Sequence, residues 1–115
     1  MVHFKHKTYP GAPDKSPEEL IKKIEVYLTK QRDLELFYNS EENGELLISA
    51  RPKHDIANRL VGTNYSVCCG VRIEKGKFFV RVGDPCLVLG TGIFGLFKAN
   101  EVFSDMWAII DNYLS

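Results

Sequence analysis

The stretch LELFYNSEENGELLISAR, residues 34–51, decides the fold class of this 115-residue chain. It holds two short runs of strand-forming residues, 34–39 and 45–51, on either side of Asn43-Gly44. Asn-Gly is the strongest short-range signal for a β-hairpin, because both residues tolerate the positive φ angles of a tight turn. We therefore predict that the two runs pair as antiparallel strands.

A second hairpin is predicted over 66–73 and 77–82, with Gly76 in its turn. Apolar residues alternate in both runs, as expected when one face of each strand is buried. The alternation assigns to the buried face Val67, Cys69, Val71, Ile73, Phe78, Val80 and Val82. Residues 2–8 alternate in the same way and predict a further half-buried strand at the start of the chain.

Two amphipathic helices are predicted around these strands. Ser16 and Pro17 supply an N-cap and a proline at the first helical position, and Glu19 follows three residues after the cap. Apolar residues then recur at three- and four-residue steps. A last helix is predicted from Asn100, as its cap, with one apolar stripe. The stripe consists of Val102, Phe103, Met106, Trp107, Ile110 and Leu114.

These elements predict an α+β fold, with an antiparallel sheet of five or six strands and the two amphipathic helices packed on one face. Residues 55–61 are predicted as one helical turn or a plain loop. With 115 residues and 44% apolar residues, the chain fits a single domain over 1–115. Helix-grip and TATA-binding-protein-like domains share this layout.

Charge and hydropathy restrict the classes of partner. Fifteen basic and fifteen acidic residues leave no net charge, so we expect no nucleic-acid partner. The uncharged stretch 86–97 is 12 residues long, which is too short to be a transmembrane helix. The first residues lack the apolar segment of a signal peptide, which predicts a cytoplasmic location.

The basic residues of the hairpin region are predicted to form solvated faces. They are Arg51, Lys53, Arg59, Arg72, Lys75, Lys77 and Arg81. Only Phe78 and Phe79 are interleaved with them, so binding of a single-stranded nucleic acid by stacking is a minor alternative.

Residues 90–95 match the G-x-G-x-x-G pattern of dinucleotide-binding loops. That pattern binds a pyrophosphate only within a β-α-β unit, and here a single helix follows it. We therefore predict no cofactor, and expect the glycines to relieve crowding where an apolar segment turns tightly.

The three cysteines are predicted to be reduced thiols, because their number is odd and Cys68 and Cys69 are adjacent. Neighbours on a strand point to opposite faces, and the chain has no C-x-x-C pair, so no metal site is predicted. An enzyme that pairs Cys69 or Cys86 with a histidine is kept as an alternative, with no catalytic residue assigned.

The apolar, glycine-rich segment 87–97 is the predicted functional surface. Its candidate binding residues are Ile93, Phe94, Leu96 and Phe97. Such a segment is either a buried strand followed by a tight turn, or an exposed loop that contacts a partner. The first hypothesis is a non-catalytic binding or accessory module for a protein partner or a small apolar ligand. A small carrier of apolar ligands is a further alternative, and self-association is left open.

Several short motifs follow one another from Arg51 onward. They are Leu60-Val61-Gly62, Val71-Arg72-Ile73, Phe79-Val80-Arg81-Val82-Gly83, the glycine-rich apolar run and Ile109-Ile110-Asp111-Asn112-Tyr113-Leu114. In these motifs the chain resembles a group of small uncharacterised bacterial domains that often accompany a zinc ribbon. The resemblance implies a sheet gripped by helices and no assigned activity. The chain departs from the group because it lacks the zinc ribbon and has a shorter apolar segment.

Overall fold

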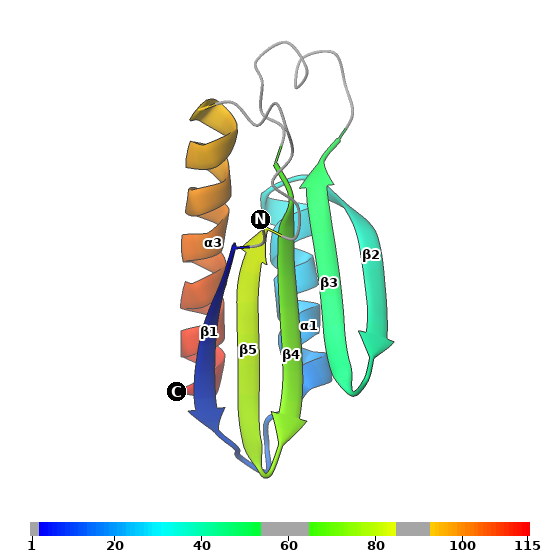
Figure 1. Cartoon of the computed structure of the whole chain (residues 1–115), viewed down its shortest axis with the longest axis vertical. Coiled ribbons are helices and arrows are strands. Elements are labelled where there is room, and N and C mark those ends of the chain that lie inside the picture. The colour runs from blue at the N-terminus through cyan, green and yellow to red at the C-terminus, as the bar shows by residue number, and fades with distance from the viewer. Residues whose placement is uncertain (1–2, 54–64, 85–92) are drawn as a thin grey trace.

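The computed structural model describes residues 3–53, 65–84 and 93–115, and gives the backbone alone for residues 3, 84 and 93–96. These residues form five strands, two α-helices and one π-helical turn (Figure 1). In chain order they are β1 (His3–Pro10), α1 (Pro17–Val26), η1 (Tyr27–Gln31), β2 (Leu34–Glu42), β3 (Glu45–Pro52), β4 (Val67–Glu74), β5 (Lys77–Asp84) and α3 (Ile93–Leu114).

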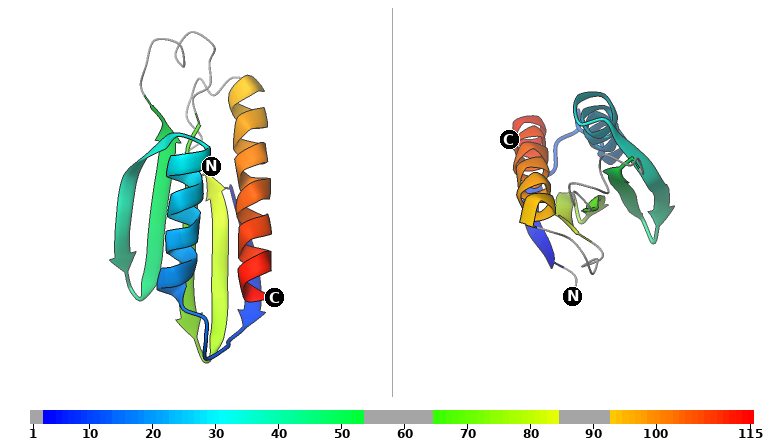
Figure 2. Two further views of the ribbon diagram at one scale, coloured as in Figure 1. Left: turned by 180° about the vertical axis from the view of Figure 1, so that it is seen from behind. Right: turned by 90° about the horizontal axis from the view of Figure 1, so that it is seen from above.

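The five strands form one sheet in the order β1-β5-β4-β3-β2, and every neighbouring pair is antiparallel. The predicted α+β class with an antiparallel sheet is confirmed. Helix α1 contacts β3 and β4, and helix α3 contacts β4 and β5 (Figure 2).

Both predicted hairpins are confirmed. Their turns consist of two residues with positive φ, 54° and 81° at Asn43 and Gly44 and 53° and 75° at Lys75 and Gly76. This combination matches the right-handed twist of the flanking strands. The first hairpin is longer than predicted, because β2 continues to Glu42 directly before its turn.

The start of α1 is also confirmed. Ser16 Oγ accepts a hydrogen bond from the backbone N–H of Glu19 at 3.1 Å, and Pro17 occupies the first helical position. Tyr113, near the end of α3, adds a contact that the sequence did not predict. Its hydroxyl accepts from the backbone N–H of Ser16 at 3.0 Å and donates to Glu19 at 2.8 Å. The end of α3 is thereby tied to the start of α1.

The predicted start of the last helix is wrong. The helix begins at Ile93, and Asn100 lies inside it rather than at its cap. A glycine inside a helix costs only about 1 kcal/mol relative to alanine, so packing of a 22-residue helix can outweigh Gly95. The predicted tight turn is therefore absent from 93–97. Some predictions concern residues outside the described part of the chain, namely 55–61, 87–92, Arg59 and Cys86.

The core lies between the helices and the sheet. Of the residues predicted to face the core in β4 and β5, all are buried except Ile73, which is 49% exposed because it lies beside the Lys75-Gly76 turn. The predicted stripe of α3 is confirmed too, with Met106 fully buried and Trp107 only 7% exposed. Side chains at the alternate strand positions point away from this core, and we call that side the outer face of the sheet.

Candidate functional site

A groove of about 730 Å³ runs between the edge strand β1 and helix α3. We call it the β1–α3 groove. Its lining residues are Phe4, Lys5, Val82, Gly83, Asn100, Phe103, Ser104, Trp107, Ala108 and Asp111.

Helix α3 forms one wall of the groove through its regular spacing. Asn100, Ser104 and Ala108 follow at four-residue steps and are exposed, so small or polar side chains line the open side. Phe103 and Trp107 are likewise four residues apart and are partly or fully buried. The groove therefore has an aromatic floor and an open mouth.

Strand β1 turns its lysines, rather than Phe4, toward α3. The ammonium groups of Lys5 and Lys7 lie 5.9 Å and 4.8 Å from the centre of the Trp107 ring. Phe4 borders the groove at the sheet edge, but its ring lies 6.4 Å from the His6 ring and 4.9 Å from the Arg81 guanidinium carbon, on the outer face. Alternation alone predicted a half-buried strand without showing which of its faces meets the helix. An inward lysine on an edge strand also hinders pairing with another sheet.

Asp111 is held at one end of the groove by Tyr9 and Lys7. The Tyr9 hydroxyl donates to Asp111 Oδ1, and Lys7 Nζ lies 3.4 Å from Asp111 Oδ2. The hydrogen bond from Tyr9, with a smaller contribution from Lys7, lowers the pKa of Asp111. Burial and the same hydrogen bond raise the pKa of Tyr9. Asp111 therefore stays charged and engaged at neutral pH.

The four predicted binding residues lie in the first turns of α3. Phe97 is 66% exposed, the largest exposed fraction among the large apolar side chains that the structure describes. The side chains of Ile93, Phe94 and Leu96 are outside the described part. Phe97 precedes Asn100 by three residues, so it lies one turn beyond the groove on the same side of the helix.

The outer face of the sheet carries three arginines stacked on phenylalanines. The guanidinium carbons of Arg81, Arg72 and Arg51 lie 4.9, 4.7 and 5.0 Å from the rings of Phe4, Phe79 and Phe37. The sequence reasoning missed this interleaving, because Phe4 and Phe37 come from the two edge strands. Only strand order brings them beside the arginines.

Each of these arginines is also paired with a carboxylate. Arg81 donates to both carboxylate oxygens of Glu45, at 2.8 and 2.6 Å. The Glu45 carboxylate lies over Gly70. A Cβ at Gly70 would come within 2.5 Å of Glu45 Oε2, which explains a glycine inside β4. A second hollow of about 440 Å³ on this face includes Arg72, Arg81 and Glu45. Its charges are largely compensated within the chain, so we assign it a structural role.

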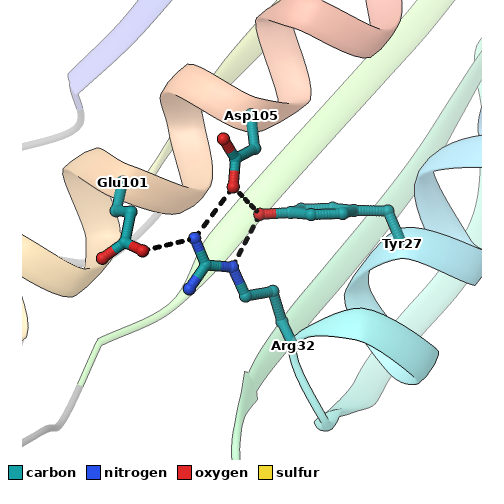
Figure 3. Close-up of polar contacts among 4 residues, drawn as sticks. All are labelled: Tyr27, Arg32, Glu101 and Asp105. Carbon is teal, nitrogen blue, oxygen red and sulfur yellow. Dashed lines mark hydrogen bonds and ion pairs between the residues drawn. The ribbon is translucent and has the colours of Figure 1, made fainter.

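A cluster of four polar side chains joins η1 to α3 (Figure 3). Arg32 donates from Nε to the Tyr27 hydroxyl and from Nη2 to Glu101 and Asp105, each at 2.8 Å. Tyr27 donates to Asp105 at 2.6 Å. Burial and the bond to Asp105 raise the pKa of Tyr27 to about 12, and the bond from Tyr27 is the largest cause that lowers the pKa of Asp105. Tyr27 is thus fixed as a neutral donor, and the cluster acts as a clamp.

We expect Arg32→Ala to lower the free energy of unfolding by about 1.5–3 kcal/mol, because hydrogen bonds to charged groups in a partly buried cluster are lost. The Arg32 side chain is 20% exposed. Arg72→Ala is the matched control, since Arg72 is 45% exposed and its pair with Glu74 should contribute less than about 1 kcal/mol. Urea unfolding followed by circular dichroism measures both. Equal losses for the two variants would contradict the clamp.

The described cysteines do not offer a nucleophile. Cys69 is fully buried in the core, and burial raises the pKa of its thiol. Cys68 is buried on the outer side of the same strand. A thiolate that attacks a substrate must be accessible to that substrate and needs a lowered pKa. Cys69 meets neither condition, so an enzyme that pairs Cys69 with a histidine is not supported. Cys86, the other predicted candidate for such an enzyme, lies outside the described residues.

Compared with known protein families and with curated proteins, the chain gives no match. Within residues 3–53, 65–84 and 93–115, no three histidine, cysteine or acidic side chains come together as a metal site would require. The described helices include none that is both long and apolar enough to cross a membrane. The groove is therefore the feature of the described structure that most favours a function.

Proposed function

We propose that the protein is a non-catalytic binding module that holds a small, largely apolar ligand in the β1–α3 groove. The observation that carries this proposal is the groove itself, with about 730 Å³ of space over Phe103 and Trp107. Pockets for small ligands usually measure roughly 300–1,000 Å³ and are lined mainly by apolar and aromatic side chains, with a few polar groups. Asn100, Ser104 and Asp111 supply such polar groups here.

The proposal includes the segment with the candidate residues Ile93, Phe94, Leu96 and Phe97. This segment directly precedes the groove-lining turns of α3. The exposed ring of Phe97 extends the apolar surface beyond Asn100. A cytoplasmic location and a relation to domains that accompany a zinc ribbon remain predictions from the sequence.

A protein partner that contacts Phe97 is the second candidate. Its support is the 66% exposure of this ring. Single exposed apolar side chains are common on protein surfaces, so this observation weighs less than a formed groove. Phe97→Ser should abolish any self-association of the wild type if the second candidate holds, and sedimentation velocity would detect that change.

Trp107 makes ligand binding directly measurable, because it is the one tryptophan of the chain and lies on the groove floor. We expect decanol to change its fluorescence, and Ala108→Phe to weaken this binding at least about tenfold by filling the groove. Ala108 is exposed, so the larger ring should leave folding intact.

Asn112→Phe is the matched control. It adds the same ring at an exposed position of α3. This position lines a different groove, between α1 and α3, which Lys23 and Tyr113 also line. It should leave decanol binding unchanged. Wild-type affinity in the Ala108→Phe variant, or no response of the wild type to decanol, would refute the proposed site.

A further inference from the structure

The charges around the β1–α3 groove are unequal. The charged side chains that line it or lie over its aromatic floor are Lys5, Lys7 and Asp111. Two positive groups thus face one negative group. A neutral chain has no general preference for anions, so this excess is a local property of the groove.

Asp111 and Lys7 satisfy each other at the lower end of the groove. Asp111 accepts from the Tyr9 hydroxyl and from Lys7, whose side chain is 34% exposed. Among the side chains that the structure describes, no carboxylate forms an ion pair with Lys5, although its charge acts on Asp111 and lowers the pKa of that carboxyl. The Lys5 ammonium lies at the groove wall, 5.9 Å from the centre of the Trp107 ring. Lys7 forms an ion pair with Asp111 and Lys5 does not, so Lys5 is the lysine to which we assign the head group of a ligand on Trp107.

We infer that the ligand of this groove is an anionic amphiphile, with an apolar body on Phe103 and Trp107 and a carboxylate-type head group at Lys5. This inference rests on the proposed function and adds the ligand's charge and orientation. The head group forms an ion pair with Lys5, whose side chain is exposed, so water and salt screen this pair in part. Asn100 and Ser104 line the opposite wall and provide hydrogen-bonding groups.

The experiment compares decanoate with decanol, which have the same apolar chain and different head groups. Trp107 fluorescence reports both titrations at neutral pH, where decanoate is ionised. We expect wild-type protein to bind decanoate about five- to tenfold more tightly than decanol, which corresponds to one partly screened ion pair. Lys5→Gln should remove this preference by weakening decanoate alone.

Lys23→Gln is the matched control. Its ammonium also lies over an aromatic ring, 5.6 Å from the centre of Tyr113, but it lines the groove between the helices. This variant should keep the preference for decanoate. Retention of the preference in Lys5→Gln, or its loss in Lys23→Gln, would contradict the assignment of the head group to Lys5.

The outcomes separate this inference from the proposed function. Equal binding of decanoate and decanol would overturn the anionic ligand and keep the binding module, with Lys5 acting only as a guard of the strand edge. Binding of neither would overturn both. A fluorescence response to vesicles of an anionic phospholipid, without a response to decanoate, would replace the free amphiphile by a lipid surface and overturn the inference.

Discussion

Trp107→Ala should lower the free energy of unfolding by about 3–5 kcal/mol, the usual cost of removing a buried tryptophan side chain. Trp107 is only 7% exposed and belongs to the core together with Met106 and Ile110. The ammonium groups of Lys5 and Lys7, from β1, also lie over its ring. Removal of the ring therefore leaves a cavity in the core and takes away the support of both ammonium groups.

The loss should be measured by urea unfolding followed by far-ultraviolet circular dichroism, because the variant has no tryptophan fluorescence. Phe97→Ala is the control on the same helix, and it should change stability by less than about 0.5 kcal/mol because Phe97 is 66% exposed. A loss under about 1 kcal/mol for Trp107→Ala would show that its ring contributes little to the core.

Local chemistry explains which elements could be predicted from the sequence. The Asn43-Gly44 turn and the Ser16 cap each depend on one or two residues with strong conformational preferences. The buried faces of β4, β5 and α3 follow from the spacing of their apolar residues. Such signals are independent of the rest of the fold.

The start of α3 could not be predicted in this way. The glycines at 90–95 favour a turn locally, whereas Ile93, Leu96 and Phe97 are spaced as in a helix. Tertiary packing of a long helix decides between these preferences, and no local signal reports it. The apolar segment was predicted to be either a buried strand followed by a tight turn or an exposed loop, and its described part, 93–97, forms the first turns of α3.

The groove was missed because it depends on two elements from opposite ends of the chain. The alternation in β1 separates Lys5 and Lys7 from Phe4, but it does not tell which set faces α3. The pairing of β1 with β5 places the lysines beside Trp107, and that pairing is a property of the sheet order. The stacked arginines of the outer face were missed for the same reason.

The second large effect is expected at alkaline pH, where the tyrosines should resist ionisation until the protein unfolds. The pKa of every one of the five tyrosines is raised above the ordinary value of 10.0, by burial or by a hydrogen bond to a carboxylate. Burial is the largest cause for four of them, and the hydrogen bond to Glu42 is the largest for Tyr38.

Because the pKa of each tyrosine is higher in the folded protein than in the unfolded chain, the tyrosines add fully to the free energy of unfolding below about pH 10. This contribution is lost as the pH rises through the pKa values of the folded protein, which reach about 12 for Tyr27. We therefore expect less tyrosinate absorbance from the native protein near pH 10 than from the unfolded chain, and a steep rise together with the loss of circular dichroism at higher pH. The same chain in concentrated urea should titrate gradually near pH 10. If all five tyrosines of the folded protein ionised near pH 10 with the circular dichroism unchanged, the hydrogen bonds of Tyr9 to Asp111 and of Tyr27 to Asp105 would be contradicted.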